Sequence, residues 1–325
     1  SHMAVYTEVS FDEARQFLLN LELGSLQTMN ACSGGIENTN YFVTTDQAPL
    51  VLTLFERLNA EQLPFYLRLM KHLATRGIPV PDPAVNAQGE IVHALCGKPA
   101  AVVNRLKGKS ELAPTIAHCT LLGDMLARMH LAGRDFAMEQ PNLRGLDWWN
   151  ATVPVVLPFM SADRAALLQS ELDYQNQQSH QRQSSTPLPR GPIHADLFRD
   201  NAMFDTDANG QPVLTGFFDF YFAGVDTWLF DIAVCMNDWC IDLPTGIIDP
   251  SRAHAFLTAY EKVRPLEAQE RLCLPDMGRA AALRFWISRL WDFHLPREAA
   301  VLQAHDPEHF YRVLQQRIQH PLTIL

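Results

Sequence analysis

Polar residues in two neighbouring segments in the second half of the chain have the types and spacing of a phosphoryl-transfer site. Asp196 and Asn201 belong to one short stretch, and Asp219 follows within the apolar segment Phe217-Phe218-Asp219-Phe220. The phosphates of ATP carry several negative charges, and the Mg²⁺ ions that bridge them prefer carboxylate and amide oxygens. We therefore expect Asn201 and Asp219 to bind Mg²⁺, and the chain to transfer a phosphoryl group from ATP.

Asp196 lies where a group is needed to orient the attacking hydroxyl and to accept its proton late. A loose transition state requires mainly positioning and charge neutralisation, so the pKa of Asp196 need not be raised much. His194 opens the same stretch, and we expect it to orient the loop through hydrogen bonds rather than to act as a base. The alternative is a purely structural loop. Strands predicted at 191–193, 202–204 and 213–218 favour catalysis.

The part of the chain before residue 104 has the signals of a small sheet. The capping box from Ser10 to Glu13 predicts a helix at 11–21. A second helix is predicted at 61–76, where apolar residues recur with helical spacing. The predicted strands are 26–32, 40–44, 50–55, 84–85, 91–94 and 100–103.

The remainder of the chain is predicted to be mainly helical. Helical periodicity is found at 118–131, after Ser161, from about Asp231 and at 279–293. We expect residues 144–149 to form a loop, and the polar segment 175–185 to be a mobile connection.

Gly34 and Gly35, followed by Asn38, Thr39 and Asn40, lie between the first two predicted strands. Glycine lets the backbone approach a phosphate closely, and Asn and Thr side chains can donate hydrogen bonds to its oxygens. Taken alone, the segment favours an ordinary hairpin turn. Its position ahead of the Asp196 stretch favours nucleotide binding instead.

The composition limits the class of protein. The chain of 325 residues is 47% hydrophobic and 19% charged, so it can form one large domain or two lobes. Its formal net charge of −10 argues against nucleic-acid binding, and no apolar stretch is long enough to span a bilayer. The six cysteines form no CxxC pair, which favours a reduced cytoplasm. Ser1 and His2 are typical of a tag remnant, and no leader is expected after Met3.

The Asp196 stretch resembles the catalytic loop of the aminoglycoside phosphotransferase and choline kinase superfamily, whose members are related to protein kinases. Ser33 to Phe42, Phe230 to Cys240 and Leu283 to Leu290 are similar to bacterial homoserine kinases of that fold. The resemblance implies an α+β, two-lobed protein-kinase-like fold, with a small antiparallel-sheet N-lobe and a larger, mainly helical C-lobe. It also implies phosphorylation of the homoserine side-chain hydroxyl with ATP and magnesium, a step toward threonine.

Alternatives remain open at this stage. One is a kinase for an aminoglycoside, choline or methylthioribose, and another is a nucleotide-binding relative that has lost catalysis. The last is motivated by Thr53, which stands where most of the superfamily has a phosphate-binding lysine on the third strand. Loop groups, metal or Arg57 must then hold the phosphates.

The resemblance also implies a domain division. The segment 104–108, beginning at Asn104, resembles the hinge where the adenine pairs with backbone groups. After the tag remnant at 1–2, we expect a nucleotide-binding lobe at 3–104 and a catalytic and substrate-binding lobe at 105–325. Asp231 resembles the aspartate that holds the catalytic loop, and the alternative is that it caps its own helix.

Homoserine carries a carboxylate, an ammonium group and the hydroxyl to be phosphorylated. Arg289 and Asp292 share one face of the predicted helix 279–293, and they are candidates to pair with the carboxylate and the ammonium. Asp238 is a second candidate for the ammonium, and Trp286 is expected to line the site. The alternative for Arg289 and Asp292 is a surface ion pair worth well under about 1 kcal/mol.

Overall fold

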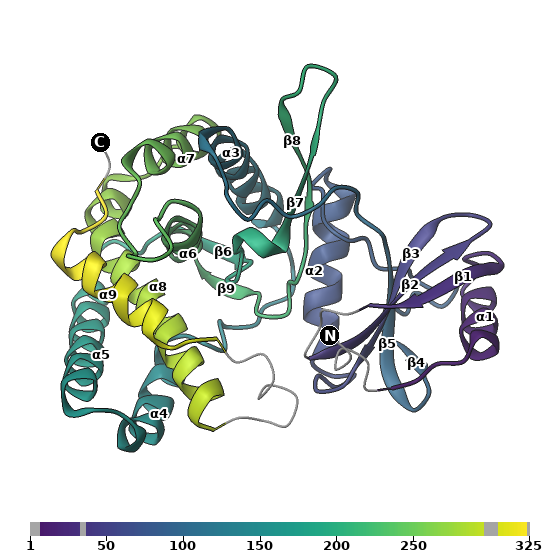
Figure 1. Ribbon diagram of the computed structural model, residues 1–325, viewed down its shortest axis with the longest axis horizontal. Coiled ribbons are helices and arrows are strands. Elements are labelled where there is room, and N and C mark those ends of the chain that lie inside the picture. The colour runs from purple at the N-terminus through teal and green to yellow at the C-terminus, as the bar shows by residue number, and fades with distance from the viewer. Residues whose placement is uncertain (1–6, 33–36, 296–304, 324–325) are drawn as a thin grey trace. The chain divides into compact units, whose positions relative to one another are not determined.

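The computed structural model describes residues 7–32, 37–295 and 305–323. The tag remnant expected at Ser1 and His2 lies outside these residues. The chain divides into two compact units, Ser1–Lys107 and Gly108–Leu325. Each unit is described in turn, and Figure 1 shows their elements.

The N-terminal unit is built on a five-stranded antiparallel sheet with the order β1-β2-β3-β5-β4. Residues of β2 and β3 pair in register from Asn38 opposite Phe55 to Thr44 opposite Pro49. The strands are β1 (Leu26–Ala31), β2 (Asn38–Thr45), β3 (Pro49–Phe55), β4 (His93–Leu95) and β5 (Lys98–Asn104). Successive side chains of a strand point to opposite faces, so alternate residues of β2, including Tyr41 and Val43, are buried.

Helix α1 (Phe11–Asn20) packs on this sheet. It begins at Ser10, whose hydroxyl accepts a hydrogen bond from the Glu13 N–H as in the predicted capping box. Ala14 and Leu18 of this helix join the apolar core formed by the strands. Helix α2 (Leu63–Thr75) lies on the other side of the sheet (Figure 1).

The C-terminal unit surrounds the apolar helix α6 (Trp228–Trp239), all of whose residues are buried. Figure 1 shows α6 in the middle of the other helices of this unit. Helix α8 packs on α6, on α4 and on α9, and α3 packs on α7. The other helices are α3 (Ile116–Gly133), α4 (Leu146–Val156), α5 (Ala162–Arg182), α7 (Pro250–Val263), α8 (Ala268–His294) and α9 (Glu308–Gln319).

Two short antiparallel pairs complete the unit and carry the segments that the sequence marks for chemistry. Strand β6 (Arg190–Ile193) pairs with β9 (Gly224–Thr227), and β7 (Ala202–Thr206) forms a hairpin with β8 (Pro212–Phe217). The predicted architecture, an antiparallel sheet followed by a mainly helical part, is confirmed. Among the described helices, none combines the length and the apolar character that crossing a bilayer requires.

Two local predictions were wrong. Residues 144–149 were expected to form a loop, but α4 begins at Leu146 because Trp149 and Val153, four residues apart, bury the same helix face. The segment 175–185 was expected to be mobile, but α5 continues to Arg182. A tertiary contact holds its beginning: Gln175 is 2% exposed and its Nε2 donates to the Asp276 carbonyl oxygen of α8 at 3.4 Å.

Candidate active site

The segment from His194 to Asn201 connects β6 to β7, and the side chain of Asp231 holds its backbone in place. Ala195 has a φ of 71°, a left-handed conformation that costs energy for a residue with a side chain. The Asp231 carboxylate holds this conformation, because its Oδ1 accepts a hydrogen bond from Ala195 N at 2.9 Å. Its Oδ2 accepts another from His194 N at 3.1 Å. Asp231, in the first turn of α6, therefore stabilises the conformation of this loop.

Asp231 is in turn held by a buried polar network. His130 Nε2 lies 2.8 Å from Asp231 Oδ2, and His130 Nδ1 lies 2.6 Å from the Tyr260 hydroxyl. Arg264 donates to the same hydroxyl and pairs with Glu270 at 2.6 Å. Burial alone would raise the pKa of Asp231, but the hydrogen bond from His130 and the other contacts outweigh it and lower that pKa. The carboxylate therefore stays charged.

His194 links the loop to the end of β8. Its Nε2 lies 2.7 Å from the Phe218 carbonyl oxygen, and its Nδ1 accepts a hydrogen bond from Asp196 N at 3.1 Å. Nε2 therefore carries the proton, and the ring is neutral. Burial lowers the pKa of His194, which preserves this state. The imidazole positions Asp196 and Phe218 and has no nitrogen left to serve as a base.

Asp196 and Asp219 are brought close enough to affect each other's charge. Burial first, and the charge of Asp219 second, raise the pKa of Asp196 well above its ordinary value, while Arg284 and Arg289 oppose the rise. The rise exceeds the expectation from the sequence, because the half-buried loop faces a second carboxylate. Asp219 has a φ of 65°, so this carboxylate is presented from a strained backbone.

Asn201 lies beside both carboxylate-bearing segments. Its side-chain Nδ2 donates to the Asp196 backbone carbonyl oxygen at 2.8 Å, and its backbone carbonyl oxygen accepts from Phe218 N at 3.0 Å. The first contact fixes the amide plane and leaves its oxygen as the available acceptor. Within the described residues, no three His, Cys, Asp or Glu side chains gather as a complete metal site. One carboxylate and one amide oxygen, completed by substrate phosphates, are a donor set that suits Mg²⁺.

The expected substrate residues have different surroundings. Arg289 stacks on Phe310 with its Cζ 4.5 Å from the ring centre, and burial lowers its pKa to about 10. Asp238, expected to bind the ammonium, uses its Oδ2 to accept from Arg199 N at 2.7 Å and from Arg199 Nε at 3.3 Å. This contact anchors the short 3-10 turn Arg199–Asn201.

Trp286 and Asp292 complete the substrate candidates. Trp286 was expected to line the site, but it is 1% exposed and packs against Tyr311, because it lies on the buried face of α8. Asp292 is half-buried and lies toward the end of the same helix.

The candidate nucleotide residues of the N-terminal unit are placed in or near β2 and β3. Asn38 and Thr39 were expected before the strand predicted at 40–44, but β2 already begins at Asn38 and contains both of them together with Asn40. Thr39 is buried and its hydroxyl bonds to Glu56 Oε2 at 2.8 Å. Thr53 donates its hydroxyl to Asn40 Oδ1 at 2.7 Å.

The remaining candidates of this unit are Gly34, Gly35, Asn104 and Arg57. Gly34 and Gly35 lie outside the described residues. Asn104 is the last residue of β5, and its Oδ1 accepts a hydrogen bond from Asp82 N at 2.7 Å. Arg57, which was considered as a replacement for the missing lysine, pairs with Glu37 at 3.0 Å.

Reasoning from the sequence missed Arg284, whose charge acts on Asp196. It lies between Leu283 and Phe285 in α8, and its charge in that apolar context was the available signal. Its surroundings are described below.

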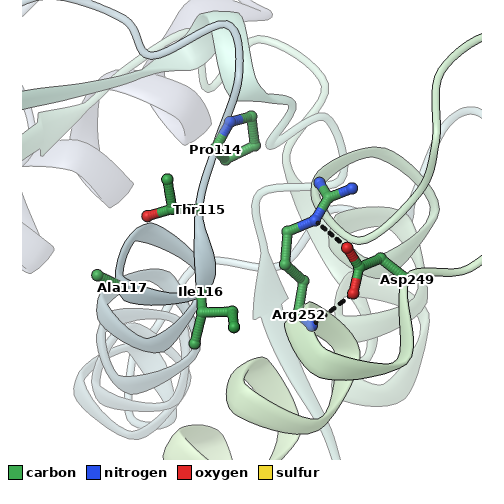
Figure 2. A pocket seen from close by; sticks show the side chains of 6 residues that line it. All are labelled: Pro114, Thr115, Ile116, Ala117, Asp249 and Arg252. Carbon is green, nitrogen blue, oxygen red and sulfur yellow. Dashed lines mark hydrogen bonds and ion pairs between the residues drawn. The ribbon is translucent and has the colours of Figure 1, made fainter.

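A separate surface pocket is formed where α3 and α7 begin, and Figure 2 shows the residues that line it. Its charged groups are Asp249 and Arg252, which pair with each other at 3.1 Å. Arg252 also donates to the carbonyl oxygens of Trp239 and Ile241. Both charged groups therefore already have partners within the protein, and we do not consider this pocket the active site.

Comparison with known proteins agrees with this geometry. Residues 28–266 match the phosphotransferase enzyme family. Among solved structures, the fold is similar to that of an amicoumacin kinase in complex with AMP-PNP and Ca²⁺. The match covers 96% of this chain and 96% of that protein, with a TM-score of 0.66 and 17% sequence identity. A choline kinase from Cryptosporidium parvum covers 90% of the chain, and 88% of that protein is covered, with a TM-score of 0.59 and 12% identity. The chain belongs to the phosphotransferase enzyme family.

Its relatives narrow the family further. The chain is 65% identical to a homoserine kinase of Polaromonas naphthalenivorans over 99% of its own length and 100% of that protein. It is 55% identical to a homoserine kinase of Cupriavidus necator over 97% of its own length and 96% of that protein. Within the phosphotransferases, the chain is therefore grouped with the homoserine kinases.

Proposed function

We propose that this protein transfers the γ-phosphoryl group of ATP to the side-chain hydroxyl of L-homoserine, forming O-phospho-L-homoserine for threonine biosynthesis. The observation that carries the proposal is the joint placement of Asp196, Asn201 and Asp219 by Asp231 and His194. The identity of 65% with a homoserine kinase over nearly the whole chain supports the choice of substrate.

Asp196 is the group that orients the hydroxyl and accepts its proton. The hydrogen bond from its own backbone N–H to His194 holds the residue in place, so little ordering remains when the substrate binds. Its raised pKa makes the ionised carboxylate a stronger base than an ordinary aspartate. The positive charges of Arg284 and Arg289 oppose the rise in this pKa and thereby favour the ionised carboxylate.

Asn201 and Asp219 are the proposed magnesium ligands. Mg²⁺ bound there would neutralise charge that develops on the phosphates during transfer. The chain's own contribution is to hold the two oxygen donors in fixed positions. The hydrogen bond from Asn201 Nδ2 to the Asp196 carbonyl fixes one donor. The hydrogen bond from Phe218 N to the Asn201 carbonyl keeps the segment leading to Asp219 beside it.

For the substrate, we propose that Arg289 binds the carboxylate and that Asp292 contacts the ammonium. Arg289 supports this role because it is largely buried and acts electrostatically on Asp196. Asp238 is a weaker candidate, because Arg199 already engages its Oδ2. For the nucleotide, Gly34, Gly35, Asn38 and Asn104 stay predictions from the sequence. Thr39 is a weaker candidate, since its hydroxyl is bound to Glu56.

The proposal is tested by measuring ADP release with ATP and Mg²⁺ in the presence of L-homoserine, choline, methylthioribose or an aminoglycoside. A blank without acceptor corrects for ATP hydrolysis. Turnover on L-homoserine that exceeds the other acceptors, and its loss on adding EDTA, is the expected result. Bound ATP with no turnover on any acceptor would favour the catalytically inactive alternative that Thr53 motivates. Preference for another acceptor would reassign the substrate.

A further inference from the structure

Arg284 is a buried cation that forms no ion pair with any residue that the structure describes. The residue is 2% exposed and lies in the middle of α8. Within the described part of the chain, its guanidinium makes a hydrogen bond to Ser288 Oγ and no ion pair. Buried charges in proteins are almost always paired, because removing a charge from water costs several kcal/mol unless a partner compensates. The surroundings of Arg284 therefore call for an anion.

A second arginine approaches the same aromatic rings. The Cζ of Arg284 lies 5.8 Å from the ring centre of Trp148 and 5.4 Å from that of Phe222. The Cζ of Arg144 lies 4.2 Å and 5.6 Å from the same two ring centres. Arg144 precedes α4 and Arg284 belongs to α8, so the fold brings two separate segments together here.

The buried guanidinium of Arg284 and the half-buried guanidinium of Arg144 repel each other. Burial, and next the charge of Arg144, lower the pKa of Arg284 to about 9, while Asp196 and Asp292 oppose this. An anion bound between or beside the two arginines would relieve the repulsion. Each guanidinium is planar by its own resonance and can bind a carboxylate through two parallel hydrogen bonds, and the contacts with the two rings restrict its orientation.

The position of this pair relative to the reacting group limits the anion. Arg284 acts electrostatically on Asp196, which is proposed to receive the hydroxyl of the substrate. The carboxylate of an amino acid such as homoserine is joined to that hydroxyl by a short aliphatic chain. When such an amino acid binds with its hydroxyl at Asp196, its own carboxylate is the anion that arrives with it.

We propose that Arg284 and Arg144, oriented by Trp148 and Phe222, form a subsite for the α-carboxylate that makes the enzyme select an amino acid over an amino alcohol. This inference rests on the proposed function. Arg289 acts on Asp196 as well and supplies a further positive charge for the same carboxylate. Besides the effect of Arg284 on the charge of Asp196, which is the same for every acceptor, the proposed contribution of Arg284 and Arg144 is to binding and selectivity.

The test compares L-homoserine with 3-aminopropan-1-ol, which has the same ammonium and hydroxyl but no carboxylate. Replacing Arg284 by methionine should lower kcat/KM for L-homoserine by about 100-fold, as is usual when one partner of a buried charged pair is lost. The rate on the amino alcohol should fall far less, because only the electrostatic effect of Arg284 on Asp196 is lost there. A parallel fall on both compounds, or an unchanged rate on L-homoserine, would overturn the subsite.

Two controls separate binding from folding. The first control is Arg279→Met. Arg279 belongs to the same helix but pairs with Glu171, so its replacement should not change the preference between the two compounds. If Arg284→Met does not fold, Arg144→Met tests the subsite instead. Arg144 is half-buried, so its replacement should disturb the fold less, and it should show the same selective loss on L-homoserine. Equal losses on both compounds in Arg144→Met would then overturn the proposal.

A readout without turnover completes the design. The rise in unfolding temperature caused by L-homoserine, measured without ATP, should disappear in Arg284→Met and persist in Arg279→Met. A rise that persists in Arg284→Met would contradict the subsite. A wild-type protein that does not phosphorylate L-homoserine would instead refute the proposed function. Wild-type activity combined with non-selective losses in the variants would refute the subsite alone.

Discussion

The carboxylate of Asp231 accepts a hydrogen bond from the backbone N–H of Ala195 at 2.9 Å, although 36 residues separate the two in sequence. Ala195 has a left-handed conformation, with a φ of 71°. The contact explains how a strained residue persists immediately before Asp196. An aspartate in a buried helix thus determines the shape of the loop that carries the proposed chemistry.

Asp231→Asn tests this relationship. The new amide group cannot accept hydrogen bonds on its nitrogen side, so at least one N–H or the His130 ring loses its partner. We expect the free energy of unfolding to fall by about 2–4 kcal/mol, with a concurrent loss of kcat. Denaturant unfolding and steady-state kinetics measure the two effects. The matched control is Asp249→Asn, a helix cap on α7, which should cost only about 1 kcal/mol. Equal losses would contradict a special role for Asp231.

Asp196→Asn should lower kcat by about 10²–10⁴-fold, because the proton acceptor for the hydroxyl is removed. The ATP affinity should change little. The free energy of unfolding at pH 7 should stay equal or increase, because the raised pKa of Asp196 shows that its charge is disfavoured in the fold. Kinetics, nucleotide binding and thermal unfolding are measured together. A variant that keeps near-normal kcat would remove Asp196 from the mechanism.

Arg289→Ala should raise the KM for L-homoserine by about 10–100-fold, since a partly buried contact to a carboxylate is lost. The KM for ATP should remain near that of the wild type. Arg164→Ala is the comparison, because Arg164 belongs to an exposed ion pair with Glu308. An unchanged KM for L-homoserine in Arg289→Ala would assign the carboxylate contact to other groups.

Asn201→Ala should raise the Mg²⁺ concentration needed for half-maximal activity by about tenfold or more, because one proposed oxygen ligand is removed. Titration of activity with MgCl₂ at fixed ATP measures the change. Asn209→Ala, in the exposed turn of the β7–β8 hairpin, provides the control and should leave the titration unchanged. The same Mg²⁺ requirement in Asn201→Ala and the wild type would exclude Asn201 as a ligand.

The buried histidines predict how stability depends on pH. Burial lowers the pKa of His130 and His194 below the ordinary value of 6.5, so both are neutral in the folded chain. Below about pH 6.5 the unfolded chain binds protons that the folded chain excludes, and stability is lost as the pH falls from there. Thermal unfolding between pH 7.5 and 4.5 should show this decline. His130→Gln cannot titrate and should decline less steeply, whereas identical slopes would contradict the argument.

Part of the site could be predicted from sequence because its determinants are local or recur in a fixed order. Asp196 and Asn201 lie in one connection, and a single hydrogen bond joins Asn201 to the Asp196 backbone. The β7–β8 hairpin then returns the chain from Asn201 to Asp219. Because these residues are joined by short connections, their spacing in the sequence predicts that they lie close together.

The roles of other residues depended on partners that spacing does not reveal. Asp238 has the charge to bind an ammonium, but Arg199 folds back onto it from 39 residues earlier. Trp286 lies on the same helix as Arg289, but the face of α8 on which it lies is buried against Tyr311. The helix α4 was missed because its burial against α8 overrides weak local signals.

The sequence by itself determined the class of chemistry, the antiparallel sheet followed by a helical part, and the choice of the stretch around Asp196 as the candidate site. The periodic spacing of hydrophobic residues and the short motifs carry that information directly. Only the tertiary structure decided that Asp231 supports the loop and that Arg284 meets Arg144 over Trp148 and Phe222. These relationships join segments far apart in the chain, and their energies come from burial and charge, which exist only once the chain has folded.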